Sequence, residues 1–314
     1  MVKVDLITGF LGSGKTTFIR RYADYLQRQE KKINIIENEF GGVSVDSIIL
    51  RDQGCDISQI AGGCMCCTGK ISFQNMLLDG AARGYDRILV EPSGIYDVDE
   101  FFDVMFTEPV KSCCEIGNIF TIVDARFDDS LSDEAKYLMF SQLLSSGKMI
   151  MSKTQLFSED TIQETLKKIN ELIAQRGCSR IFSDDVCTKP WDALTDEDFA
   201  SFEQAGYRIS DHEREFMQHG SIFTARVMAG RCENEKDLKE RLERLMNDSS
   251  LGKILRIKGH IADTSGHWYE VNCSLDGFYI KPAAIKKGLF IVIGQDINET
   301  ALQESFLPRQ KSKR

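Results

Sequence analysis

The sequence predicts an α/β fold, a parallel sheet covered by helices on both faces, followed by a small α+β domain. Three observations support this prediction. Short apolar segments alternate with amphipathic segments up to about residue 182. Glycine-rich or acidic turns follow several of the apolar segments. From about Trp191 the alternation ends, and the later segments are typical of an antiparallel sheet.

The first domain is expected to span residues 1–205. Its strands are predicted at residues 2–8, 32–36, 87–90, 119–124 and 148–151, with a small extra strand at 47–51. Helices are predicted at residues 17–29, 71–82, 138–144, 158–175 and 195–205. Ser158 is the expected N-cap of the fourth of these helices. The segment Arg180-Ile181-Phe182 closes the alternating pattern.

A polar segment at residues 206–220 is expected to be a linker. The second domain, residues 221–308, is predicted to combine a mostly antiparallel sheet with two helices, at 235–246 and 298–306. Its strands are predicted at residues 221–228, 253–258, 267–272, 278–281 and 289–293. Residues 309–314 form a basic tail.

The composition is that of a soluble globular protein, because hydrophobic residues make up 42% of the 314 residues and charged residues 28%. A formal net charge of -9 and a pI near 5.2 argue against nucleic acid or an anionic membrane as a partner. No apolar run is long enough to span a bilayer, and a strand begins almost at Met1, where a signal peptide would lie. We therefore expect a cytoplasmic protein.

The first motif follows the first predicted strand. Residues 9–16 read Gly-Phe-Leu-Gly-Ser-Gly-Lys-Thr, which fits the phosphate-binding loop G-x-x-x-x-G-K-[ST] between a strand and a helix. Lys15 is expected to reach the β- and γ-phosphates, and the Thr16 hydroxyl to ligate Mg²⁺. The expected nucleotide contacts in this segment are Gly12, Ser13, Gly14, Lys15, Thr16 and Thr17. The motif predicts a nucleotide site.

Acidic residues follow two other predicted strands. Glu37 and Glu39 lie in an acidic turn after residues 32–36, where open α/β sheets bind ligands. Glu91 ends the strand at 87–90, which is the Walker B position for holding Mg²⁺, and Gly94 allows a close approach to the γ-phosphate. The alternatives are a solvated surface turn and a capping or ion-paired Glu91. We assign Lys15, Glu39 and Glu91 as the candidate catalytic residues.

The chain has ten cysteines, and in a cytoplasmic protein we expect them to be free thiols or metal ligands, not a disulfide framework. Cys64, Cys66 and Cys67 fall within four residues, after a glycine pair. Three thiolates suit Zn²⁺, Cu(I) or a similar thiophilic ion and leave a fourth position open for transfer. A disulfide from Cys64 to Cys66 or Cys67 is the redox alternative. The other five cysteines considered are scattered, and we expect them to act as small buried apolar residues: Cys55, Cys178, Cys187, Cys232 and Cys273.

These motifs, in this order, resemble the CobW family of P-loop GTPases, which is related to the urease and hydrogenase nickel-insertion GTPases. The matching segments are the phosphate loop, Glu-Asn-Glu-Phe-Gly, Gly-Gly-Cys-Met-Cys-Cys and Glu-Pro-Ser-Gly. The resemblance implies slow GTP hydrolysis with Mg²⁺, and Zn²⁺ or Co²⁺ bound at the three cysteines. It also implies that Glu37 and Glu39 lie near nucleotide and metal.

Two positions depart from the family pattern. Gly42 stands where the family usually carries an acid. The loop after residues 148–151 reads Ser152-Lys153-Thr154-Gln155, where the family's guanine-reading loop resembles Asn-Lys-x-Asp. Ser152, Lys153 and Gln155 are therefore the expected base contacts. Because an amide is a poor acceptor for the two guanine donors, we expect weaker preference for GTP over ATP.

The leading hypothesis is a nucleotide-hydrolysing metallochaperone that delivers metal to a client metalloprotein. A nucleotide- or metal-dependent dimer is compatible with it. One alternative is a metal- and nucleotide-binding regulator with little turnover. Another is an NTP-dependent activator of a corrinoid or other metal-cofactor enzyme.

Overall fold

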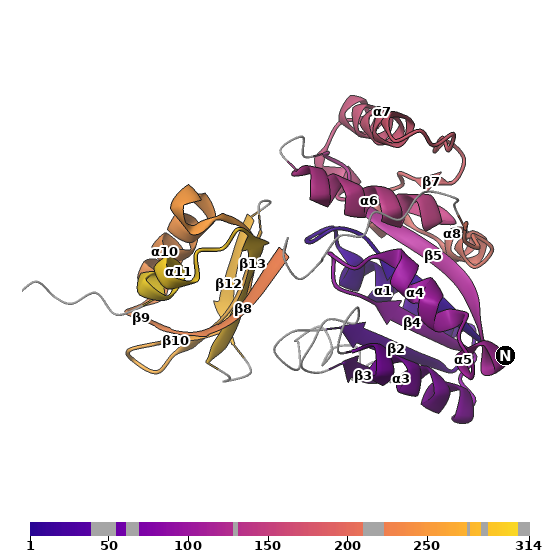
Figure 1. The fold of residues 1–314 in the computed structure, drawn as a ribbon, viewed down its shortest axis with the longest axis horizontal. Helices are drawn as coiled ribbons and strands as arrows, with labels where there is room; N and C mark the ends of the chain where they lie inside the picture. Colours follow the sequence, from indigo (N-terminus) through magenta and orange to yellow (C-terminus); the bar gives the residue numbers. More distant parts are fainter. Residues whose placement is uncertain are drawn as a thin grey trace, which may run out of the picture. The chain divides into compact units, whose positions relative to one another are not determined.

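The computed structural model describes residues 1–38, 55–60, 69–127, 131–209, 223–274, 277–283 and 288–306. The chain divides into two compact units, Met1–Arg214 and Glu215–Arg314 (Figure 1). Among the described residues, no helix combines the length and apolarity that a membrane span needs.

The first unit is built on a parallel sheet with the strand order β3-β2-β4-β1-β5-β6-β7. Its strands are β1 (Val2–Thr8), β2 (Ile33–Asn38), β3 (Asp56–Ile60), β4 (Arg87–Glu91), β5 (Cys114–Asp124), β6 (Lys148–Ser152) and β7 (Val186–Cys187). Its α-helices are α1 (Lys15–Arg28), α3 (Lys70–Ala82), α4 (Val98–Met105), α5 (Val110–Cys113), α6 (Asp133–Ser145), α7 (Glu159–Gln175) and α8 (Asp196–Phe202). Two short 3₁₀ helices are η1 (Thr154–Leu156) and η2 (Trp191–Ala193).

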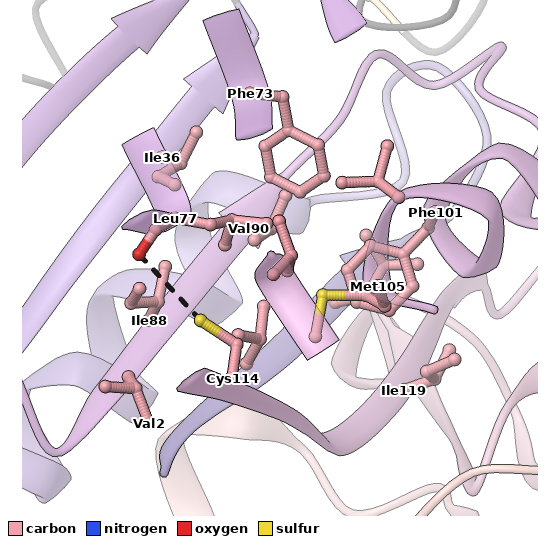
Figure 2. Close-up of a cluster of buried hydrophobic side chains, with 14 of the residues drawn as sticks. Val2, Ile36, Phe73, Leu77, Ile88, Val90, Phe101, Met105, Cys114 and Ile119 are labelled. Carbon is pink, nitrogen blue, oxygen red and sulfur yellow. Dashed lines mark hydrogen bonds between the residues drawn. The ribbon is translucent and has the colours of Figure 1, made fainter. Parts of the chain in front are cut away.

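Helices cover both faces of this sheet, because its strands are apolar on both sides. Val4 and Leu6 of β1 belong to a core beneath α3, α4 and α5, whereas Ile7 belongs to a second core beneath α1 and α8. Figure 2 shows the first core, in which the buried thiol of Cys114 lies 3.8 Å from the carbonyl oxygen of Leu77. Because successive side chains of β1 point to opposite faces of the sheet, this strand contributes to both hydrophobic cores.

A buried ionic cluster crosses the core on the α1 side. Arg87 at the start of β4 donates to Asp5 of β1 at 2.5 Å and to Glu203 at 3.1 Å. Asp5 also accepts from the Tyr22 hydroxyl at 3.1 Å and from the backbone N–H of Asn118 at 2.8 Å. The guanidinium is therefore neutralised by carboxylates of the chain itself.

The second unit contains a mainly antiparallel sheet of order β12-β11-β10-β13-β8, with β9 pairing parallel to β10. Its strands are β8 (Phe223–Ala229), β9 (Arg231–Cys232), β10 (Lys253–Asp263), β11 (Trp268–Ser274), β12 (Gly277–Pro282) and β13 (Leu289–Gln295). Its helices are α10 (Glu235–Asn247), η3 (Ser249–Leu251) and α11 (Glu299–Phe306). Leu238, Leu242 and Leu245 of α10 pack onto strand residues such as Ile257 and Val271.

The predicted fold class is confirmed, and several elements differ in detail. Ser158 caps α7 as predicted, since its hydroxyl accepts from the backbone N–H of Thr161. The alternating pattern was expected to end at residues 180–182, but the last strand of the sheet, β7, lies four residues later. β5 begins at Cys114, five residues before the predicted start, and β3, α4 and α5 were not predicted. The predicted strand at 47–51 lies outside the described residues.

The start of the predicted linker contacts the first unit. The backbone N–H of Gly206 donates to Asn118 Oδ1 at 2.8 Å, and that of Arg208 to the Ser145 carbonyl oxygen at 3.0 Å. Residues 210–220 and 309–314 lie outside the described residues, so the linker at 206–220 and the basic tail stay predictions.

Candidate nucleotide and metal site

The site forms at the edge of the sheet where the parallel strands end. Thr8 of β1, Glu37 of β2, Glu91 of β4, Asp124 of β5 and Ser152 of β6 all lie at this edge. Sequence segments far apart therefore present their strand ends to a single region, as open α/β sheets do at ligand sites.

The phosphate-binding loop connects β1 to α1. Gly14 caps α1 in a left-handed conformation with φ 101°, which a residue with a side chain rarely adopts. Lys15 is only 6% exposed, and its ammonium donates to the carbonyl oxygens of Gly9 at 2.9 Å and Phe10 at 3.2 Å. The lysine thus folds back over its own loop. The N–H groups at the start of α1 and this ammonium suit a phosphate group.

The phosphate loop and β4 meet through Thr16 and Glu91. The Thr16 hydroxyl donates to Glu91 Oε1 at 2.8 Å, although 75 residues separate the two in sequence. This is the pair that the sequence assigned to Mg²⁺. Hydroxyl and carboxylate oxygens are ligands that Mg²⁺ prefers. The residues present therefore fit that ion.

Glu37 joins this pair from the neighbouring strand. It is 4% exposed and in register with Glu91, so both side chains leave the same face of the sheet. Ile35 and Leu89, two residues earlier on the same strands, pack under α1, which identifies the face. Two carboxylates side by side at a buried strand end repel each other, and a cation between them removes that repulsion.

Gly94 brings the segment after β4 against the phosphate loop. A Cβ at this position would lie 2.6 Å from the backbone nitrogen of Leu11, so any side chain would clash with the loop backbone. The buried Gln142 of α6 holds the segment, because its Nε2 donates to the carbonyl oxygens of Tyr96 at 3.1 Å and Gly94 at 3.4 Å. The predicted close approach at Gly94 is thus directed at the loop that would hold phosphates.

The expected base contacts lie at the end of β6. Ser152 is buried, and its hydroxyl donates to the Val123 carbonyl oxygen at 3.4 Å. Lys153 has φ 59°, and its ammonium is 2.5 Å from Asp124 Oδ2. Gln155 is exposed in η1. Asp124 therefore neutralises the lysine of this loop, which the sequence analysis did not propose.

Trp191 is a residue of this region that sequence reasoning missed. Its indole N–H donates to the Met151 carbonyl oxygen at 2.8 Å, at the end of β6. The far edge of its ring would lie 3.1 Å from a Cβ at Gly14. The indole therefore occupies the corner between the phosphate loop and the Ser152 loop. Its sequence signal is weak: a tryptophan after Pro190, where the alternation of apolar and amphipathic segments ends.

The remaining predicted site residues, Glu39, Cys64, Cys66 and Cys67, lie outside the described residues, as does Gly42. Strand β3 ends at Ile60, four residues before Cys64, and Ile60 is in register with Asn38 at the end of β2. Strand β3, the last described element before the cysteines, therefore ends at the same edge of the sheet as Glu37 and Glu91. Among the described residues, no group of three or more His, Cys, Asp or Glu could hold a metal ion.

The scattered cysteines are mostly buried, as expected. Cys55, Cys187, Cys232 and Cys273 are buried, whereas Cys178 is partly exposed. Burial raises the pKa of the Cys55, Cys232 and Cys273 thiols to about 11 each. These thiols stay protonated at neutral pH, and a protonated thiol is a poor metal ligand.

The family model described as CobW/HypB/UreG, nucleotide-binding domain, matches residues 3–177. The chain is 31% identical over 179 residues to "Zinc chaperone YjiA" of Escherichia coli, covering 54% of this chain and 55% of that protein. It is 27% identical over 182 residues to "Zinc-regulated GTPase metalloprotein activator 1" of Schizosaccharomyces pombe, covering 54% and 44%.

The solved structure of Zn(II)-bound YjiA GTPase from E. coli aligns over 97% of this chain and 98% of that chain, with 19% identity and a TM-score of 0.45. The chain spans about half the length of the curated relatives it matches. The family model covers more than half of the 314 residues. The chain therefore belongs to the CobW/HypB/UreG family.

Proposed function

We propose that the protein is a slow nucleoside triphosphatase that carries a transition metal and releases it to a client metalloprotein according to nucleotide state. The observation that carries this proposal is the 2.8 Å hydrogen bond from Thr16 to Glu91, beside the buried Glu37. It joins the phosphate loop to the end of β4, and β2, which carries Glu37, lies between β4 and β3, the strand that ends four residues before Cys64. Nucleotide and metal would therefore meet at one edge of the sheet.

At the nucleotide, Lys15 and the loop N–H groups would bind the β- and γ-phosphates. The residues that would hold Mg²⁺ are Thr16 and Glu91, and the ion would neutralise charge on the transferred phosphoryl group. In hydrolysis, water attacks the γ-phosphorus, the bond to the β–γ bridging oxygen breaks, and the diphosphate leaves. Glu91 and Glu39 are the acids proposed to orient the water, and Gly94 would admit the γ-phosphate next to the loop.

At the base, Ser152, Lys153 and Gln155 would contact the ring. GTP is the proposed substrate, with ATP as the weaker one, because the relatives' names include a GTPase while Gln155 lacks the carboxylate that favours guanine. Asp124 pairs with the Lys153 ammonium, and the aliphatic stem of Lys153 would cover the base.

The cargo would be Zn²⁺ or Co²⁺ at Cys64, Cys66 and Cys67, with Glu37 as the neighbouring carboxylate. Zinc is favoured because several relatives are named zinc chaperones. Three thiolates leave a coordination position open, which suits transfer to a client. The thiols must ionise to bind, so binding releases protons.

The test measures Zn²⁺ affinity by chelator competition with the chain in three states: without nucleotide, with GDP and with a non-hydrolysable GTP analogue. We expect affinity to differ between the two nucleotide states by roughly five- to 150-fold, the range of coupling free energies of 1–3 kcal/mol. The Cys64→Ser/Cys66→Ser/Cys67→Ser variant should lose the tight site, and Cys178→Ser, a partly exposed cysteine elsewhere, should keep it. Equal affinities in all three states, or an unchanged triple variant, would refute the proposal.

A further inference from the structure

The second unit contains a cavity of about 620 Å³. It is lined by the connection from β8 to β9, by α10, by the end of β10 and by the start of β11. This volume is within the range of sites that bind small organic molecules, about 300–1,000 Å³. The nucleotide and cysteine motifs all lie in the other unit, so they do not account for this cavity.

A buried arginine lines the cavity. Arg241 of α10 is 5% exposed, and its Nε donates to Asp237 Oδ1 at 2.9 Å, one helical turn earlier. Its Nη1 is buried and has no hydrogen-bond acceptor within the described part of the chain. An N–H group removed from water without an acceptor is costly, which makes an acceptor in the cavity favourable.

The charged groups around the cavity are two arginines and two carboxylates. Arg231 and Arg241 contribute two cations to the lining, and Glu233 contributes one anion. Asp237 already pairs with Arg241 from the helix side. These four charges cancel, so the preference for a carboxylate rests on the guanidinium N–H groups, which match the two oxygens of a carboxylate as paired donors. A doubly charged phosphate would be repelled by Glu233.

The rest of the lining is mainly apolar. Ala229, Ala262 and the partly exposed Trp268 belong to this part of the lining. An aromatic ring such as Trp268 binds flat apolar groups by stacking. The ligand should therefore combine one carboxylate with a flat apolar body.

We propose that this cavity is a binding site for a small aromatic or otherwise flat carboxylate, held by Arg231 and Arg241 and stacked on Trp268. The site is independent of the proposed nucleotide and metal functions. A free small molecule and the C-terminal residue of a peptide share this chemistry. The volume of about 620 Å³, which is typical of small-molecule sites, favours the free molecule.

The experiment uses the full chain with the substitution Trp191→Phe, which leaves Trp268 as the single tryptophan, because the sequence contains two. The probe is 3-phenylpropionate, and binding is followed by Trp268 fluorescence. We expect a saturable change in emission, with 3-phenylpropionamide at least tenfold weaker because it lacks the charge. A short peptide ending in phenylalanine with a free carboxylate provides the second arm. Tighter binding of that peptide than of the free acid would overturn the choice of a free molecule.

Matched variants test the two cations. Arg231→Ala should weaken the probe about fivefold or more, and Arg241→Gln more strongly. Arg226→Ala removes an exposed arginine of the same unit that pairs with Glu299, outside the cavity lining, and should leave affinity unchanged. If Arg241→Gln unfolds, Arg231→Ala alone decides the matter. No saturation up to about 10 mM, equal affinity for the amide, or an unchanged Arg231→Ala variant would overturn the proposal.

Discussion

Two buried cations of the first unit have different partners. Arg87 is the first residue of strand β4, and Lys15 is the first residue of helix α1. Arg87 is 5% exposed and pairs with two carboxylates, Asp5 and Glu203. Lys15 is 6% exposed and donates to neutral carbonyl oxygens of its own loop. The two carboxylates tie Arg87 to the fold, whereas the two carbonyl contacts hold the Lys15 ammonium over the phosphate-binding loop, where an external phosphate would bind. Exposure alone does not separate the two roles.

The largest effect is expected at Arg87. Arg87→Met leaves Asp5 buried without its main partner, which should lower the free energy of unfolding by about 3–5 kcal/mol. Urea denaturation measures this loss. The double variant Asp5→Leu/Arg87→Met removes both charges and should recover part of the stability. A loss below about 1 kcal/mol for Arg87→Met would show that the cluster is not a structural ion pair.

Lys15→Ala should give the opposite result. Loss of a charged donor to phosphate is worth about 1.5–3 kcal/mol per hydrogen bond, so nucleotide affinity should fall roughly 100-fold, while the unfolding free energy changes little. Phosphate release over multiple turnovers should fall to background. Lys189→Ala, which removes a cation paired with Asp198 in the same unit, is the control and should keep its nucleotide affinity. Full affinity in Lys15→Ala would place the phosphates elsewhere.

Trp191→Ala should have a smaller effect that is specific to the base. Its indole lies between the phosphate loop and the base loop, and a stacked base is worth about 1–3 kcal/mol. GTP and ATP affinities should both fall about tenfold, while tripolyphosphate, which has no base, binds as before. Trp191→Phe should retain most of the affinity. If tripolyphosphate binding falls equally, Trp191 supports the loop and does not contact the base.

Gln155→Asp should change the choice of base and leave phosphate binding unaffected. Restoring a carboxylate that can accept from guanine should raise the GTP-to-ATP affinity ratio roughly tenfold, by strengthening one charge-assisted hydrogen bond. Competition binding measures the ratio. Gln155→Ala is the control, and it should leave the ratio near that of the native chain. A native chain that already prefers GTP strongly, with no change in the variant, would assign guanine recognition to another group.

The sequence was sufficient to predict those elements whose local residue pattern agrees with the fold. The phosphate loop, the strand ending at Glu91 and the helix capped by Ser158 each have a residue signature that survives in the structure. Helix α4 was missed although Asp97 caps it and Val98, Phe101 and Met105 are spaced for one face.

Other features depend on tertiary contacts that no local pattern contains. The pairing of Thr16 with Glu91 requires β1 and β4 to be neighbours in the sheet, which strand order alone decides. The sequence suggested the region but not the contact. Trp191, which is distant from the phosphate loop in sequence, lies next to Gly14 in the structure. Asp124 at the end of β5 pairs with Lys153, which follows the neighbouring strand β6. These side chains become neighbours only when the sheet forms.

The contacts of Gln142 make α6 part of any motion near the phosphate loop. Its side-chain amide holds Gly94 and Tyr96, and its backbone carbonyl oxygen accepts from the Thr121 hydroxyl of β5 at 2.8 Å. A displacement of the segment at 94–96 must therefore pull α6 along or break two hydrogen bonds in a buried setting, which costs free energy. The Gln142 amide therefore couples the position of the segment at 94–96 to that of helix α6.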